Sequence, residues 1–227
     1  MKTFRLLIAA AGIVSLSIIS YYVIVVVMAR DYTRDVIIKD LESKSWRRPN
    51  GSVNGFLLSA GDMTQRQLDI LLAVEDPTFF EHNGMDLRTP GAGITTLTQG
   101  LVKILYFENF KPGIRKVKQT LIAVFALDPL ISKEDQLLLS INALYLGHED
   151  EKEIRGFEEA AQSYYGKSFE SLTEDEYVSL VAMIIAPNSF HVLRHPEENA
   201  ERVRRIKKLV AGEYKPSGLM DVYYEKH

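Results

Sequence analysis

The chain has 227 residues, of which 46% are hydrophobic and 25% charged, and it has no cysteine. The length allows one domain with a short additional segment, and the composition excludes a disordered chain and a disulfide scaffold. Without cysteine, a thiol nucleophile, a thiolate zinc site and an iron–sulfur cluster are also excluded. The net charge of −3 identifies no class of partner by itself.

The first apolar segment, residues 6–29, predicts a transmembrane helix. Its 24 residues hold no group that is charged at neutral pH, and as a helix they would reach about 36 Å, enough to cross a bilayer with some tilt. A cleaved signal peptide is the alternative, since Lys2 and Arg5 precede it, but the apolar stretch exceeds the usual ~7–15 residues. A buried soluble helix fits less well because nearly every face is apolar. Basic residues flank both ends, so their count does not settle the orientation.

The remaining chain divides into three predicted parts: a polar stalk at residues 30–59, a globular domain at 60–212 and a tail at 213–227. Trp46, the single tryptophan, falls in the stalk between basic residues, and we expect it at the membrane interface. Beyond residue 29 acidic side chains outnumber basic ones, so we expect no nucleic-acid partner.

Apolar spacing and capping signals predict a mostly α domain. Thr64 with Gln67, and Thr173 with Glu176, have the capping-box pattern, and Gly166 has the pattern of a helix C-terminus. No segment of useful length alternates with a period of two residues, so no strand is predicted. The predicted helices cover residues 64–76, 95–107, 113–128, 132–147, 156–165, 173–186 and 196–212.

Glu75 is the first candidate for chemistry, because helical spacing places it on the same stripe as three leucines. Partial burial raises the pKa of a carboxyl group, which suits a general base or acid. The alternative is an ordinary carboxylate at a helix end. Asp76 and His82 follow closely, although a histidine in such a turn is more often a structural hydrogen-bonding residue.

A second group of candidate residues lies in a glycine–threonine loop, residues 91–99, that leads into a predicted helix. Glycines allow close backbone approach to a ligand, and free N–H groups at a helix N-terminus suit a phosphate or a sugar. Together with a semi-buried carboxylate, cations near this loop would serve transfer from a pyrophosphate donor. A solvated helix face is the alternative explanation for the basic residues that follow: Lys103, Lys111, Arg115, Lys116 and Lys118.

Five ordered motifs between about residues 60 and 210 resemble those of the family 51 glycosyltransferases, the peptidoglycan polymerases found alone or fused to penicillin-binding domains. They are Glu75-Asp76-x-x-Phe79-x-x-His82-x-Gly84; Gly93-Ile94-Thr95-Thr96-Leu97-Thr98-Gln99 with Lys103; Arg115-Lys116-Val117-Lys118; Ile141-Asn142-x-x-Tyr145-x-Gly147 with Gly156 to Lys167; and Leu180 to Phe190. The length leads us to expect the monofunctional, membrane-anchored form.

The resemblance implies a lysozyme-like, mostly α domain on the outer face of the cytoplasmic membrane, held by a single span. Such enzymes join lipid II units by a β-1,4 bond, with inversion and loss of undecaprenyl pyrophosphate. The implied partners are lipid II, the nascent glycan strand, membrane lipid and other cell-wall synthesis proteins. A divalent cation, Mg²⁺ or Mn²⁺, commonly assists.

Carried over residue by residue, the resemblance makes Glu75 the base for the acceptor 4-hydroxyl and the candidate ligand of the divalent cation. Gln119 occupies the position of a second catalytic glutamate. Basic residues would bind the diphosphate, and further motif residues would bind substrate or shape the cleft. These substrate-binding candidates are Asp76, Phe79, His82, Thr96, Gln99, Lys103, Lys111, Arg115, Lys118 and Asn142.

Three positions depart from the family pattern: Gln119 replaces a glutamate, Gly100 a glutamine and Ile104 an asparagine. Glutamine cannot carry a proton or bind a metal as a carboxylate does. A pseudoenzyme that binds lipid II or a cell-wall partner without turnover is therefore an alternative to the active polymerase. A lysozyme-like hydrolase with Glu75 as the acid is a third alternative, but it gives the basic residues no role.

Overall fold

The computed structural model describes residues 2–225 of the chain, and it is mostly α-helical as the sequence predicts. Two short antiparallel hairpins are the only sheets in this described part. The elements in chain order are α1 (Lys2–Tyr32), the π-helical turn η1 (Thr33–Ile37), α2 (Ile38–Glu42), β1 (Ser45–Arg47), β2 (Val53–Gly55), η2 (Ala60–Asp62), α3 (Gln65–Glu75), α4 (Leu97–Tyr106), α5 (Ile114–Ile122), η3 (Ala123–Leu127), α6 (Lys133–Ala143), β3 (Tyr145–Glu149), β4 (Lys152–Arg155), α7 (Phe157–Tyr165), η4 (Phe169–Ser171), α8 (Glu174–Met183) and α9 (Pro196–Val210).

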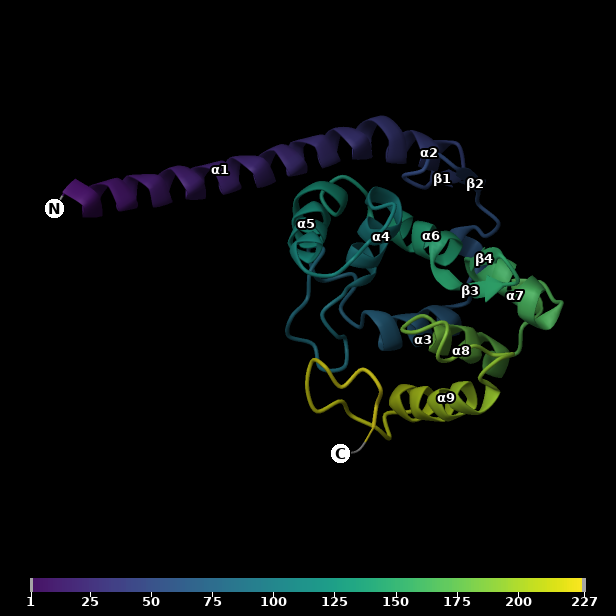
Figure 1. Cartoon of the computed structure of the whole chain (residues 1–227). Helices are drawn as coiled ribbons and strands as arrows, with labels where there is room; N and C mark the ends of the chain where they lie inside the picture. Colours follow the sequence, from purple (N-terminus) through teal and green to yellow (C-terminus); the bar gives the residue numbers. More distant parts are fainter. Residues whose placement is uncertain (1, 226–227) are drawn as a thin grey trace.

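Helix α1 projects from the body of the molecule along most of its length (Figure 1). The continuous helix Thr3–Glu42 has a mean hydropathy of 2.3 over its most apolar stretch and is a candidate membrane span by length and composition. Its large apolar side chains near the N-terminus are exposed, as those of a helix that faces lipid would be.

The predicted stalk is folded against the domain. The helix continues past Arg30 through the π-helical turn, and Arg30 Nη1 donates a hydrogen bond to the Phe125 carbonyl at 2.6 Å. Thr33 Oγ1 and the Tyr106 hydroxyl lie 2.6 Å apart.

The expectation that Trp46 sits at the membrane interface is wrong. Only 3% of this residue is exposed, because its ring packs into a core with residues of α1 and α4.

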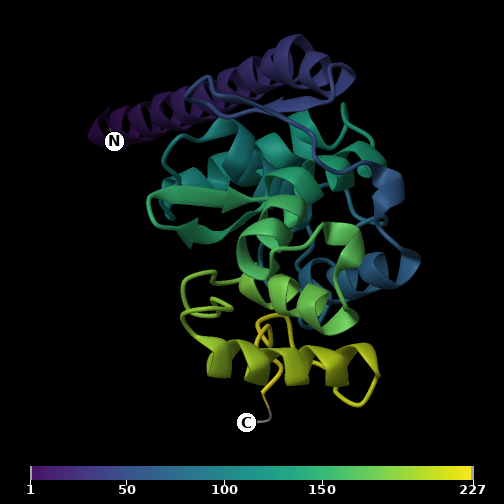
Figure 2. The same cartoon turned by 90° about the vertical axis from the view of Figure 1, so that its right-hand side faces the viewer.

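Two hydrophobic cores stabilise the domain, and α6 contributes to both. Residues of α3, α7, α8 and α9 surround Ile141 in the first core. Residues of α4 and η3, together with Ala29 of α1, surround Leu139 and Ala143 in the second. The 90° view shows α9 along the lower side of the domain, with α8 above it (Figure 2). Helix α3 thus belongs to the first core and α4 to the second.

The capping predictions are confirmed. Thr64 and Thr173 each form a capping box, and Gly166 ends α7 in the left-handed conformation. The predicted helix 132–147 ends earlier, at Ala143, and the chain then forms β3. The strands have only three to five residues, too short for alternation to be recognised in the sequence.

Gly156→Ala tests the junction between β4 and α7. Gly156 has φ +75°, and a Cβ atom there would lie 2.6 Å from the Asn142 carbonyl oxygen. We expect a loss of about 3 kcal/mol in the free energy of unfolding, from backbone strain and overpacking. Chemical denaturation of the detergent-solubilised protein measures it.

Gly100→Ala is the matched control, because a Cβ atom at Gly100 meets no atom within 4 Å and the site is inside a helix. We expect it to raise stability by about 0.5–1 kcal/mol. Equal stability of the two variants would contradict this account of the junction.

Candidate active site

A cleft of about 390 Å³ opens between the two cores, and Glu75 lines it. The glycine–threonine loop and the first turns of α4 form one side. Segments after α6 and α8, together with α9 and the C-terminal residues, form the other. Its lining comprises Val74, Glu75, Ala92, Gly93, Ile94, Thr95, Thr96, Leu97, Gly100, Lys103, Ile104, Leu144, Tyr145, Ile184, Ile185, Pro187, Arg202, Met220 and Val222.

Glu75 is the last residue of α3 and keeps partial exposure to solvent. Burial of its carboxyl group raises the pKa from an ordinary carboxyl value to about 7. Arg202 and Lys103 oppose this rise, whereas the neighbouring Asp76 adds to it. A carboxyl group with this pKa can exist in both protonation states near neutral pH, which is the property required of a general base.

Asp76 ties α3 to α4 beneath the cleft. Its carboxylate accepts hydrogen bonds from His82 Nε2 at 2.9 and 3.0 Å and from the Leu97 N–H, at the start of α4, at 2.9 Å. Since the Gly84 N–H donates to His82 Nδ1, the proton of the neutral ring is on Nε2. Asp76 and Phe79 are buried, and neither they nor His82 line the cleft. Direct contact of Asp76, Phe79 and His82 with substrate stays a prediction, and their position outside the cleft lining argues against it.

The N-terminus of α4 is fixed by a capping box that the sequence analysis did not identify. Thr96 Oγ1 accepts from the Gln99 N–H at 3.1 Å and donates to the Gly84 carbonyl at 3.0 Å. Gln99 is buried, and its Nε2 donates to Thr120 on α5. Thr96 lines the cleft, whereas Gln99 lies outside the lining and connects α4 to α5.

The basic residues separate into two groups. Lys103 lines the cleft, and burial lowers the pKa of its ammonium group. Lys111 and Arg115 are exposed on the α5 side, and the Lys118 ammonium lies 4.9 Å from the centre of the Tyr21 ring on α1. These three predicted diphosphate contacts therefore lie outside the cleft lining.

Lys116 is the cation on α5 that reaches the glycine–threonine loop. Its Nζ donates to Thr95 Oγ1 at 2.8 Å and to Gln99 Oε1 at 3.3 Å. Burial, aided by repulsion from Lys103, lowers the pKa of Lys116 to about 8. Lys116 belongs to the predicted basic run but was not predicted as a site residue, because the spacing does not show which lysine of a helix reaches the loop.

Gln119 and Asn142 are both buried in the protein interior, and the Gln119 Oε1 has no hydrogen-bond partner among the described residues. Gln119 is 1% exposed, and its Nε2 donates to the Gln99 carbonyl at 2.6 Å. Asn142 Oδ1 accepts from the N–H groups of Leu57 and Leu58, and its Nδ2 donates to two further carbonyls. Neither side chain lines the cleft. The amide of Gln119 is thus placed to brace α4 and not to meet a ligand.

The cleft offers little to a divalent cation. Glu75 is the one carboxylate in its lining, and it faces the cations Lys103 and Arg202. Within residues 2–225 no group of three or more His, Asp or Glu side chains could hold a metal ion. A single carboxylate among cations does not make a protein site for Mg²⁺ or Mn²⁺. The predicted ion would need ligands from the substrate.

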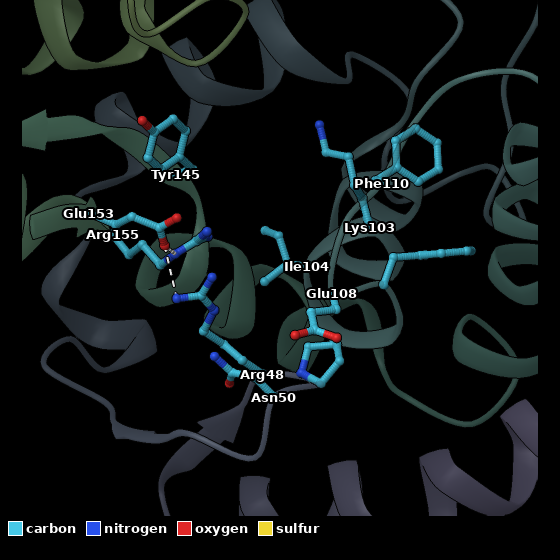
Figure 3. A pocket seen from close by; sticks show the side chains of 11 residues that line it. Arg48, Asn50, Lys103, Ile104, Glu108, Phe110, Tyr145, Glu153 and Arg155 are labelled. Atoms are coloured by element: carbon cyan, nitrogen blue, oxygen red, sulfur yellow. Dashed lines mark hydrogen bonds and ion pairs between the residues drawn. The ribbon is translucent and has the colours of Figure 1, made fainter. Parts of the chain in front are cut away.

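A second chamber of about 230 Å³ adjoins the first, and the two share Lys103, Ile104 and Tyr145 (Figure 3). Arg48 of the first hairpin and Arg155 of β4 both pair with Glu153, at 2.9 and 3.0 Å. These arginines give the chamber a cationic side that the sequence analysis did not identify, since they lie 107 positions apart in the chain.

Residues 44–211 match the family model described as Transglycosylase. The chain is 33% identical over 175 residues to penicillin-binding protein 1B of Escherichia coli, covering 71% of this chain and 20% of that protein. It is 32% identical over 209 residues to penicillin-binding protein 1A of Streptococcus oralis, covering 85% and 30%, respectively. Penicillin-binding protein 1F of Bacillus subtilis is 30% identical over 158 residues, covering 64% and 21%. The chain thus spans between a fifth and a third of these relatives, and the predicted family resemblance is confirmed.

Gln119→Glu tests whether this position can hold a carboxylate. The new carboxyl group would be buried against the Gln99 carbonyl oxygen, so its pKa would be raised in the folded protein. A raised folded-state pKa means that stability falls as pH rises above the unfolded value of about 4.3. We expect a loss of about 2–4 kcal/mol at pH 7 and a much smaller loss at about pH 4.

Denaturation at both pH values measures this loss, with Asn83→Asp as the control because Asn83 is an exposed amide outside the cleft. A pH-independent effect of Gln119→Glu equal to that of the control would show that the site accepts a charge.

Proposed function

Because the chain belongs to the transglycosylase family, we propose that it is a peptidoglycan glycosyltransferase that polymerises lipid II by β-1,4 transfer. The observation that carries the proposal is Glu75, whose pKa of about 7 suits a base, in a cleft shared with Lys103. The base and a cation for the leaving group are the two functions that the reaction requires.

In the proposed step, the Glu75 carboxylate removes the proton from the acceptor 4-hydroxyl. The acceptor oxygen then forms a bond to C1 of the donor sugar as the bond between C1 and the diphosphate oxygen breaks. Attack from the opposite face inverts the configuration at C1. Undecaprenyl pyrophosphate leaves with the bonding electron pair, and Lys103 and Lys116 at the glycine–threonine loop stabilise its charge.

Helix α1 serves as the proposed membrane anchor, because the lipid-linked substrate lies in the same bilayer. Its candidate span continues directly into contacts with η3 and α4, so the cleft is held at a fixed position relative to the anchor. We propose that the domain lies on the outer face of the cytoplasmic membrane.

A protein that binds lipid II without turnover is the second candidate, and Gln119 favours it. Its buried amide leaves Glu75 as the one carboxylate of the cleft, and no other acidic side chain in the lining takes the position of a second one. The single carboxylate also argues against a hydrolase, since glycoside hydrolysis ordinarily uses a pair.

The test is polymerisation of lipid II by the purified full chain across pH 5.5–8.5. Since Glu75 must be deprotonated and Lys116 protonated, activity should rise with a midpoint near pH 7 and fall again above about pH 8. Glu75→Gln should abolish it, whereas Asp69→Asn, an exposed carboxylate on the same helix, should not change it. Polymer of equal yield from Glu75→Gln would contradict the role of Glu75.

The second candidate predicts saturable lipid II binding with no polymer at any pH. The same assay therefore separates the two functions, provided that binding is measured in parallel with product.

A further inference from the structure

The residues after α9, 213–225, fold back against the glycine–threonine loop, and we call them the C-terminal segment (Figure 1). The N–H of Gly91 donates to the Gly218 carbonyl at 2.9 Å, and the N–H of Gly93 donates to the Leu219 carbonyl at 2.8 Å. Two segments more than 120 positions apart are thus joined through their backbones at one side of the cleft.

The two glycines are required by this contact. Both have positive φ, +79° for Gly91 and +69° for Gly93. A Cβ atom on Gly91 would lie 2.7 Å from Pro216, and one on Gly93 would lie 3.1 Å from Val222. The sequence predicted that these glycines allow close approach of a ligand. In the structure they allow close approach of the C-terminal segment.

The C-terminal segment also holds Arg202, which is 2% exposed. Arg202 Nη1 donates to the Val222 carbonyl at 3.1 Å and its Nε donates to the Ala182 carbonyl at 3.1 Å. Its guanidinium carbon lies 5.3–5.7 Å from the centres of the Phe190, Tyr223 and Tyr224 rings. A buried guanidinium group is costly unless it is hydrogen-bonded in this way, and here it lines the cleft with Glu75.

A further contact reaches the end of α3 itself. The Tyr224 hydroxyl, in a residue that is 3% exposed, donates to the Val74 carbonyl at 2.9 Å. Val74 directly precedes Glu75, so Tyr224 fixes the helical turn from which the carboxylate projects.

The outer edge of the C-terminal segment is apolar and open to solvent. Met220 is 64% exposed, and Met220 and Val222 line the cleft together with Ile94 of the glycine–threonine loop. A solvent-exposed methionine at the mouth of a cleft is an adaptable contact for the methyl groups of a ligand.

We propose that the C-terminal segment forms a functional wall of the cleft: Tyr224 and Val222 position α3 and Arg202 around Glu75, and Met220 makes an apolar contact with the bound substrate. This inference rests on the proposed function for the identity of the substrate. It makes Tyr224 and Arg202 positioning residues and Met220 a determinant of substrate affinity.

The Met220 contact is tested by binding, in the Glu75→Gln background, so that turnover is not needed. Lipid II in detergent micelles is titrated into the full chain carrying Met220→Ala or Met85→Ala. Met85 is also an exposed methionine but does not line the cleft. We expect Met220→Ala to weaken binding about fivefold and Met85→Ala to leave it unchanged. Equal affinities of the two variants would overturn the proposal.

The Tyr224 contact is tested by kinetics, with Tyr164→Phe as the matched control. The Tyr164 hydroxyl is likewise buried and donates to a backbone carbonyl, that of Leu146, at 2.7 Å, but far from Glu75 in the chain and outside the cleft lining. Both variants should lose similar thermal stability. Only Tyr224→Phe should lower kcat, about tenfold, with KM for lipid II unchanged. Equal kcat values in the two variants would show that Tyr224 has only a structural role.

The two proposals can fail separately. If the wild type binds lipid II without forming polymer, and Met220→Ala weakens that binding, the Met220 contact is confirmed and the polymerase function is not. If polymer forms and the binding of Met220→Ala equals that of the control, the Met220 contact is wrong and the function stands. Absence of both binding and polymer would overturn both.

Discussion

The bond between the Asp76 carboxylate and the first N–H of α4 is the constraint on which the site depends. Asp76 directly follows the last residue of α3, and Leu97 begins α4, so one side chain fixes the relative position of the two helices that carry Glu75 and Lys103. A carboxylate at a helix N-terminus is also stabilised by the unpaired N–H groups there. His82 supplies two further bonds to the same carboxylate, which satisfies the buried charge. The first motif thus connects α3 and α4 beneath the cleft, and Glu75, one residue before Asp76, is its only member that lines the cleft.

Electrostatics in the cleft balance two opposed effects on Glu75. Burial favours the neutral acid, whereas Arg202 and Lys103 favour the carboxylate, and burial prevails enough to raise the pKa to about 7. Burial also lowers the pKa values of Lys103 and Arg202, and it lowers that of Lys116 beside the glycine–threonine loop to about 8. A diphosphate entering such a site would bring negative charge to cations that have little solvent to screen it, and its interaction with them would be strong. The same arrangement explains why one carboxylate and several cations coexist in the cleft without forming a metal site.

The parts of the fold that follow from local chemistry could be predicted, and those that depend on distant contacts could not. The capping boxes at Thr64 and Thr173 need only residues three positions apart, so the sequence displays them. The short hairpins depend on pairing and leave no periodic pattern. Trp46 resembled an interfacial residue because its neighbours are charged, yet tertiary packing buries it. In the site, Glu75 was found because its spacing and its motif agree, whereas Arg202 lies in a basic helix whose sequence does not distinguish the one buried arginine from its exposed neighbours.

Gln119 shows why matching a motif position does not establish a role. By alignment of motifs it stands where a catalytic glutamate is expected, and by size it could occupy the same space. Its amide, however, donates to a backbone carbonyl of α4, a bond that an ionised carboxylate cannot make because it has no proton to donate. The residue therefore contributes to the brace between α4 and α5, in parallel with the bond from Gln99 to Thr120. In this chain the two helices are held by neutral amides where the family pattern has a charge, so the charged side chains of the cleft lining are those of Glu75, Lys103 and Arg202.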